Sequence, residues 1–159
     1  VGGGFAGLSL IKHIDTKEFQ VILLDRNNYH TFQPLLYQVA TAGLDAGSIA
    51  YPLRRYIRRF ENVLFRMADV NEICLDKDFV KTSIGNLHYN YLVVATGSEG
   101  NFFGNSELEI KAMQLKNVTQ ALDIRSLLLQ NFELASQIPE LSDREAYMNF
   151  VIAGGAQQA

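Results

Sequence analysis

The sequence has little of several residue types, and each shortage excludes a class of site. There is one cysteine, Cys74, so neither an internal disulfide nor a paired-thiol redox centre can form among these residues. Its three histidines are scattered without the spacing of metal ligands, so we predict no metal site. No apolar run reaches the ~18 residues that cross a bilayer, and the first residues do not resemble a signal peptide.

The chain also lacks an excess of charge. Its formal net charge is −3, so we expect no nucleic-acid partner. Four arginines are nevertheless clustered, at positions 54, 55, 58 and 59. Such a basic helix face is usually solvated, but it could also meet anionic lipid or the acids of a partner. A length of 159 residues and a hydrophobic content of 48% suit a globular domain.

Glycine is concentrated at the start of the chain. Gly2, Gly4 and Gly7 match the pattern G-x-G-x-x-G, with Phe5 and Ala6 between the last two. This turn joins a strand to a helix and lets the backbone approach a pyrophosphate, which the free N–H groups of the helix then face. Because such turns are common, the pattern alone is equally consistent with a plain tight turn.

A carboxylate follows at the distance that a nucleotide site requires. Residues 5–14 have helical spacing, and residues 20–25 form a β-rich run that ends at Asp25, eighteen residues after Gly7. That is close to the roughly 20-residue spacing of the acid that binds an adenosine ribose. A solvated acid at a strand end is the alternative, and the glycines favour ribose binding. Arg26 opens the polar turn that follows.

The middle of the chain mixes patterns. Residues 31–43 follow neither period, so they form either a buried connection or the wall of a ligand pocket, which we favour. A helix is predicted from Gly47 to Phe60 with Ser48 as its N-cap. Residues 62–90 then alternate like a small antiparallel meander, with Cys74 as a small buried residue in one strand.

The rest of the chain contains two further strand signals. Residues 91–97 predict a strand buried on both faces that ends at Thr96 and Gly97, where open α/β folds bind ligands. Residues 118–135 predict a long amphipathic helix with Asn117 or Thr119 as its cap. Residues 136–146 are expected to be a linker, and residues 147–155 a strand running into a second glycine turn.

Together these blocks resemble the two-dinucleotide-binding flavoproteins, and within them the type II NADH dehydrogenases, which are NADH:quinone oxidoreductases. The wider resemblance rests on the glycine turn, Asp25, the strand end at residues 95–97 and the turn at Gly154. The narrower one rests on residues 25–41, which contain F-Q-P-L-L-Y-Q-V-A, and on residues 49–54 and 101–104.

The resemblance implies an α/β fold of the Rossmann-like, FAD-binding, three-layer type, with a parallel sheet and the inserted meander at about 62–90. The FAD-binding part would cover residues 1–135, and an NADH-binding Rossmann unit would begin at 147–159. The chain would correspond to the N-terminal third to half of such an enzyme.

The resemblance also assigns roles to residues, all of them in cofactor binding and none in catalysis. Gly2, Gly4 and Gly7, with Phe5 and Ala6, would hold the FAD pyrophosphate, and Asp25, with Arg26 beside it, the adenosine ribose. The adenine would meet the backbone of Val70. The ribityl and diphosphate region would lie along Gln33, Pro34, Leu35, Ala95, Thr96 and Gly97. Gly154 and Gly155 would begin the NADH turn.

The end of the chain departs from the family pattern. The second turn usually reads close to G-G-G-P-T-G, whereas Ala156 and Ala159 replace glycines here. Either this nucleotide site is degraded, or the residues after Gly155 do not follow contiguously. The second interpretation is favoured because A-Q-Q-A also resembles the A-Q-x-x-Q quinone-site segment near the family's C-terminus.

The implied activity is hydride transfer from NADH to FAD and onward electron transfer to a membrane quinone. Peripheral attachment to the cytoplasmic side of the inner or plasma membrane would use segments beyond these residues, and a homodimer is compatible with it. The alternatives are a sulfide:quinone, ferredoxin-type or disulfide-type reductase of the same superfamily, a non-catalytic dinucleotide-binding module, or a structural fragment without ligand. Cys74 alone suits the disulfide chemistry poorly.

Overall fold

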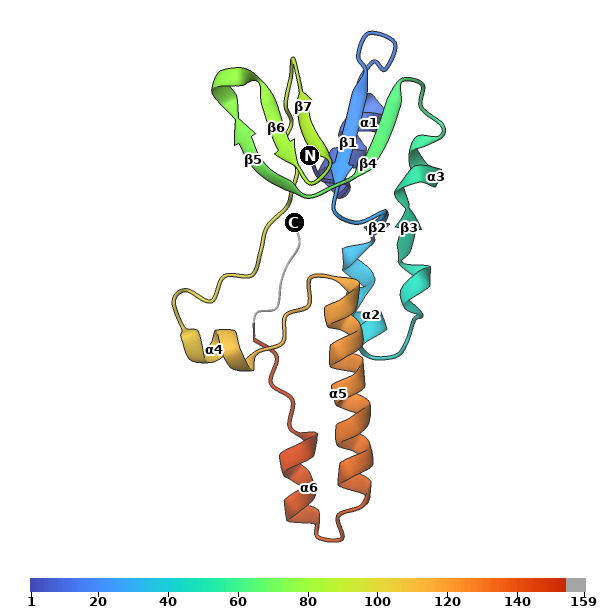
Figure 1. Ribbon diagram of the computed structural model, residues 1–159. Helices are drawn as coiled ribbons and strands as arrows, with labels where there is room; N and C mark the ends of the chain where they lie inside the picture. The colour runs from blue at the N-terminus through green and yellow to red at the C-terminus, as the bar shows by residue number, and fades with distance from the viewer. Residues whose placement is uncertain (154–159) are drawn as a thin grey trace.

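The computed structural model describes residues 1–153 (Figure 1). At its centre is a parallel sheet in which β1 (Val21–Asp25) pairs with β4 (Val63–Met67). The first residues extend this sheet on the other side of β1, because the Gly2 N–H donates to the Leu24 carbonyl at 2.8 Å. The Ala95 N–H donates in turn to the Val1 carbonyl at 2.7 Å. The strand β1 is therefore bordered by β4 on one side and by the start of the chain on the other.

Helices α1 (Phe5–His13) and α3 (Leu53–Ile57) cover one face of the sheet. The side chains of β4 alternate, with Val63 and Phe65 buried and Leu64 exposed, as a sheet with one covered face requires. Two helices and two strands thus share one apolar core, whose buried members are Leu8, Ile11, Leu23, Leu53, Ile57, Val63 and Phe65.

An antiparallel meander forms the third layer. It consists of β5 (Val70–Cys74), β6 (Phe79–Thr82) and β7 (Gly85–His88), with the 3₁₀ helix η3 (Leu75–Lys77) between the first two. The prediction of a meander from about 62 to 90 was too wide, because residues 63–67 pair with β1 instead. An alternating strand has the same pattern in either sheet, and its partner is decided by tertiary contacts.

The meander stands apart from the parallel sheet. A cavity of about 570 Å³ lies between them, lined on one side by Ile22 and Leu24 of β1 and on the other by Val80 and Leu87. Figure 1 shows the two sheets diverging from their shared end.

A β-ribbon replaces the first part of the helix predicted from Gly47. Strand β2 (Tyr29–Thr31) pairs with β3 (Ala50–Pro52), and α3 begins only at Leu53. Proline disfavours the helical conformation in the residue before it, so Tyr51 stays extended. Ser48 closes the 3₁₀ helix η2 (Ala46–Ser48), whose cap is Asp45.

The predicted long helix is confirmed as α5 (Val118–Ser136). Its cap is Asn117, whose side-chain oxygen accepts from the Gln120 N–H at 2.9 Å. α5 packs on α2 (Leu36–Ala40), which follows the 3₁₀ helix η1 (Gln33–Leu35). A short helix, α4 (Ser106–Lys111), lies in the segment before α5.

Helix α6 (Leu141–Met148) returns alongside α5, and the two form an arm that extends away from the sheets (Figure 1). The strand predicted from residue 147 was wrong, because Tyr147 and Met148 end α6 and residues 150–153 are in neither helix nor strand. The helix also covers part of the predicted linker. A strand is held by its neighbours, and residues 149–153 pair with no described strand. Gly154 and Gly155 lie outside the described residues.

The strand predicted at 91–97 is also corrected. Only Val1 pairs with it within residues 1–153, and Val93 and Val94 are 47% and 57% exposed rather than buried on both faces. Burial on both faces requires a packed layer on each side of the strand. A sequence pattern cannot show whether those layers are present. In the part of the chain that the structure describes, no helix has the length and apolarity to cross a bilayer.

Candidate dinucleotide-binding site

Backbone contacts explain two of the three glycines in the turn. Gly2 has a φ of +103°, and a Cβ there would overlap the carbonyl of Ala95. A Cβ on Gly7 would overlap the carbonyl oxygen of Gly2. Since both neighbours are main-chain atoms, no side chain fits at either position without moving the sheet or the helix.

Gly4 occupies a different environment. A Cβ there would meet no atom within 4 Å, so the turn is open at this point. The first helical hydrogen bond of α1 runs from the Leu8 N–H to the Gly4 carbonyl at 3.0 Å. The N–H groups of Gly4, Phe5, Ala6 and Gly7 therefore have no acceptor in residues 1–153. Free donors at the positive end of a helix, beside open space, suit an anion.

Asp25 links the end of β1 to the turn. One carboxylate oxygen accepts the Gly3 N–H at 2.6 Å, and the other accepts the Asn27 N–H at 2.7 Å. A carboxylate has about four acceptor positions, so both oxygens can still accept a hydroxyl. Asp25 can thus fix the turn and bind a ribose at once. Its neighbour Arg26 is exposed.

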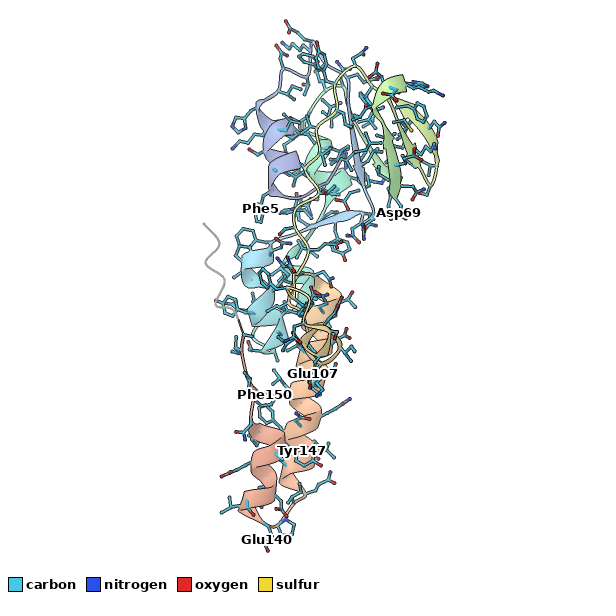
Figure 2. All side chains as sticks on the ribbon, turned by 90° about the vertical axis from the view of Figure 1, so that its left-hand side faces the viewer. Phe5, Asp69, Glu107, Glu140, Tyr147 and Phe150 are labelled. Carbon is cyan, nitrogen blue, oxygen red and sulfur yellow. The ribbon has the colours of Figure 1, made fainter. Side chains whose placement is uncertain are left out.

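Three aromatic side chains pack against one another beside the turn, a feature that the sequence interpretation missed. The ring of Phe5, labelled in Figure 2, meets the His30 and Phe32 rings edge-on, at centroid distances of 4.9 and 5.6 Å. His30 Nδ1 lies 3.0 Å from the Gly3 carbonyl, which can only accept, so this nitrogen donates. Twenty-seven residues separate His30 from Gly3, and no local periodicity indicates such a contact.

Gly3 is the other residue that the sequence interpretation missed. A Cβ there would lie 2.8 Å from the Leu53 Cδ1 atom and 3.1 Å from an Asp25 oxygen. Gly3 therefore lets the turn lie directly on α3. Its position between two glycines of the pattern was the only available signal.

The predicted residues 33–35 begin next to the turn, because Phe32 contacts Phe5. Gln33 Nε2 donates to the Lys116 carbonyl at 3.3 Å, which joins η1 to the segment before α5. Pro34 is exposed, and Leu35 packs on the core shared by α2 and α5. Their placement connects the turn to α5.

Residues 95–97 lie directly over the turn. The Ala95 carbonyl and the Thr96 nitrogen face the position of a Gly2 Cβ, and Thr96 is exposed. Gly97 has a φ of +75°, which a side chain disfavours. The structure therefore brings together the glycine turn, Asp25 and the 95–97 segment.

Val70 flanks this cluster from the meander. The Ala68 N–H donates to the Asp25 carbonyl at 2.9 Å, so the chain passes the end of β1 just before β5 begins at Val70. The Val70 side chain is half-buried.

The titratable groups with shifted side-chain pKa values lie away from this site, on the meander. Desolvation and a hydrogen bond to Glu72 raise the pKa of the Cys74 thiol, whose sulfur lies 3.4 Å from a Glu72 oxygen. Hydrogen bonding to Lys81 lowers the pKa of Glu72 and raises that of Lys81. A thiol with a raised pKa is a poor redox nucleophile. The described residues contain no cluster of three metal-ligating side chains.

The family model of the pyridine nucleotide-disulphide oxidoreductases matches residues 1–157. The chain belongs to this family. Among its curated relatives, a type II NADH:quinone oxidoreductase of Mycobacterium tuberculosis is 35% identical over 97% of this chain and 34% of its own length. An external alternative NAD(P)H-ubiquinone oxidoreductase of Arabidopsis thaliana is 32% identical over 98% of this chain and 29% of its own. These relatives confirm the narrower resemblance seen in the sequence.

Solved structures of this pyridine nucleotide-disulphide oxidoreductase fold agree. A Plasmodium falciparum NDH2 in complex with NADH superposes with a TM-score of 0.78 at 25% identity, covering 91% of this chain and 30% of the other. A sulfide:quinone oxidoreductase of Aquifex aeolicus gives a TM-score of 0.73 at 24% identity, which supports the α/β fold. The chain spans about a third of the length of the curated relatives above.

Proposed function

We propose that this chain forms the FAD-binding part of an enzyme that transfers electrons from NADH to a membrane quinone. The main support is the turn, in which the N–H groups of residues 4–7 have no acceptor within residues 1–153 and the preceding Gly3 N–H donates to the Asp25 carboxylate. The relatives are NADH:quinone and NAD(P)H-ubiquinone oxidoreductases, and these activities supply the substrates of the proposal.

The residues present fit an FAD molecule. The N–H groups of Gly4, Phe5 and Ala6 would hold the pyrophosphate, because they begin a helix and have no acceptor within residues 1–153. Asp25 would accept the ribose hydroxyls with the lone pairs that Gly3 and Asn27 leave free. When bound, FAD supplies the redox chemistry, and the protein supplies binding and orientation.

Other parts of the chain would complete the cradle. The backbone of Ala95, Thr96 and Gly97 would lie along the diphosphate and ribityl side, and Val70 would lie at the adenine. The Gln33 contact with Lys116 would keep η1 beside the cofactor. The rings of Phe5, His30 and Phe32 would hold the turn in place rather than react. No residue of this chain is assigned a proton-transfer step.

The NADH site, the membrane association and the assembly also belong to the proposal. Gly154 and Gly155 would begin the NADH turn. A membrane quinone lies in the bilayer, so the enzyme would associate with it peripherally. The resemblance implies the cytoplasmic side of the inner or plasma membrane. The assembly compatible with the resemblance is a homodimer.

The test uses the intact natural protein. We expect flavin absorbance in the purified protein and NADH oxidation with a quinone acceptor. Gly4→Ala should reduce flavin content at least tenfold while the protein stays folded, because Gly4 has ordinary backbone angles and its Cβ would enter only the open space. Ser9→Ala, on the exposed side of the same helix, is the matched control. A wild-type protein that has no flavin and does not oxidise NADH would rule the proposal out.

A further inference from the structure

The peptide bond between Gly3 and Gly4 lies in the middle of the glycine turn, and its orientation decides where one N–H donor points. Within residues 1–153 every peptide bond is trans, so the Gly3 carbonyl and the Gly4 N–H point in opposite directions. The carbonyl is directed at His30, whose Nδ1 donates to it at 3.0 Å. The Gly4 N–H is therefore directed away from His30, and it has no acceptor among the described residues.

The preceding peptide bond is held at both of its polar groups. Its N–H, on Gly3, donates to the Asp25 carboxylate at 2.6 Å. Its carbonyl, on Gly2, lies against Gly7, where a Cβ would not fit. Among residues 1–153, by contrast, the Gly3–Gly4 peptide is held only at its carbonyl, by His30.

Backbone sterics do not fix the Gly3–Gly4 peptide. Gly4 has a φ of −78°, and rotating the peptide by half a turn would bring this angle to a positive value. Glycine adopts positive and negative φ about equally readily, and neither residue has a side chain that would resist the rotation. The rotated peptide would direct a carbonyl oxygen, in place of the N–H, away from His30. An anion on that side would then meet an acceptor instead of a donor.

The His30 side chain is itself held in place. Its backbone belongs to β2, where it pairs with Tyr51 of β3. Its ring meets the Phe5 ring edge-on, with an interplanar angle of 85°. Because His30 is half-buried, its hydrogen bond to the Gly3 carbonyl competes less with water than an exposed one would.

We propose that His30 is a positioning residue for the cofactor, because its Nδ1–H holds the Gly3–Gly4 peptide with the Gly4 N–H available to the pyrophosphate. The inference rests on the proposed function, in which that anion belongs to FAD. Without the His30 donor, the apoprotein can rotate the peptide so that the carbonyl meets water. Binding of FAD must then rotate it back and leave a half-buried carbonyl without a donor, which weakens the affinity.

The test measures the dissociation constant of FAD by titration calorimetry, with apoprotein prepared from the intact natural protein. His30→Phe keeps a ring beside Phe5 but has no donor. It should weaken FAD binding about tenfold, as expected for a carbonyl left unpaired. His30→Asn loses the ring, but its Nδ2 donor is the same number of bonds from the backbone as Nδ1 of histidine. It should bind FAD within about threefold of wild type.

His13 provides the matched control, because its Nδ1 lies 2.8 Å from another main-chain carbonyl, that of Ser9 in α1. His13→Phe and His13→Asn should leave the FAD affinity unchanged. Urea unfolding of each apoprotein shows whether the variants fold, and its midpoint should change little in His30→Phe, since the free peptide can rotate. His30→Leu removes the donor without added bulk if His30→Phe does not fold.

Two results would overturn the proposal while leaving the enzyme assignment intact. One is an FAD affinity that is unchanged in His30→Phe, which would mean that the peptide keeps its orientation without the donor. The other is an equal loss of affinity in His30→Phe and His30→Asn, which would assign the effect to the imidazole as a whole. A wild-type protein that binds no FAD would contradict the proposed function itself, and this inference with it.

Discussion

The glycine turn and the α5–α6 arm differ in what constrains which residue can stand at each position. In the turn, main-chain atoms pack against each other, and Gly2 and Gly7 have no room for a Cβ. In the arm, α5 buries only Ala121 and Ala135 among its nineteen residues, while Leu129 remains 53% exposed. The turn is thus specified by contacts inside the described residues, whereas the leucines of the arm have few contacts there.

This difference separates two kinds of sequence signal. A glycine that a backbone contact requires is fixed by local geometry. Its replacement should therefore lower stability whether or not another surface covers it. A leucine on an exposed helix face acquires its importance only from a surface that covers it. Each of the following predictions compares a substitution in or beside the sheets with one in the arm or on another exposed surface.

Gly7→Ala should give the largest loss of stability, about 4 kcal/mol, because its Cβ would overlap the Gly2 carbonyl and force α1 away from the sheet. Ser136→Ala, at the end of α5, removes only an exposed hydrogen bond to the Glu133 carbonyl and should cost less than about 0.5 kcal/mol. Urea unfolding followed by circular dichroism measures both. Equal losses would mean that the turn can relax around a methyl group.

Leu53→Ala should cost about 3 kcal/mol, because Leu53 is fully buried between α1 and β4 and the substitution leaves a cavity. Leu129→Ala removes the same atoms from an exposed helix face and should be nearly neutral. Thermal denaturation of the two variants compares them directly. If Leu129→Ala proved as damaging as Leu53→Ala, the arm would be buried against another surface of the intact protein.

Asp25→Ala should cost about 2 kcal/mol, because the Gly3 and Asn27 N–H groups would lose a charged acceptor. It should also weaken flavin binding beyond this loss of stability, since the ribose would lose its acceptor. Asp123→Ala, on the exposed face of α5, is the paired control. Flavin retained during gel filtration separates the two effects, and an Asp25→Ala protein with full flavin would contradict the ribose assignment.

The sequence predicted the turn, the helix after it, β1 and α5, because each depends on nearby residues. Glycine spacing and the 3.6-residue period are local, and the Asn117 cap stands immediately before its helix. The α/β fold follows from these elements in order.

The prediction failed where partners decide the structure. Residues 63–67 alternate as a meander strand would, yet they pair with β1. Pro52 lies inside the helix predicted from Gly47 to Phe60. In the structure it is the last residue of the β2–β3 ribbon, because Tyr51 pairs with His30. The contact of His30 with Gly3 joins residues that no period relates. These contacts depend on tertiary pairing, which one sequence does not reveal.

The two exposed ion pairs give the comparison with the smallest expected effect, since neither pair should affect stability. Desolvation and the Glu72 carboxylate raise the pKa of Cys74, so Glu72→Gln should lower it and free Lys81 to favour the thiolate. Alkylation of Cys74 at mildly alkaline pH should therefore become a few-fold faster. Glu107→Gln removes the other exposed pair and should leave that rate unchanged. If the rate stayed constant in the Glu72 variant as well, burial alone would control the thiol, and its contact with Glu72 would have no chemical effect.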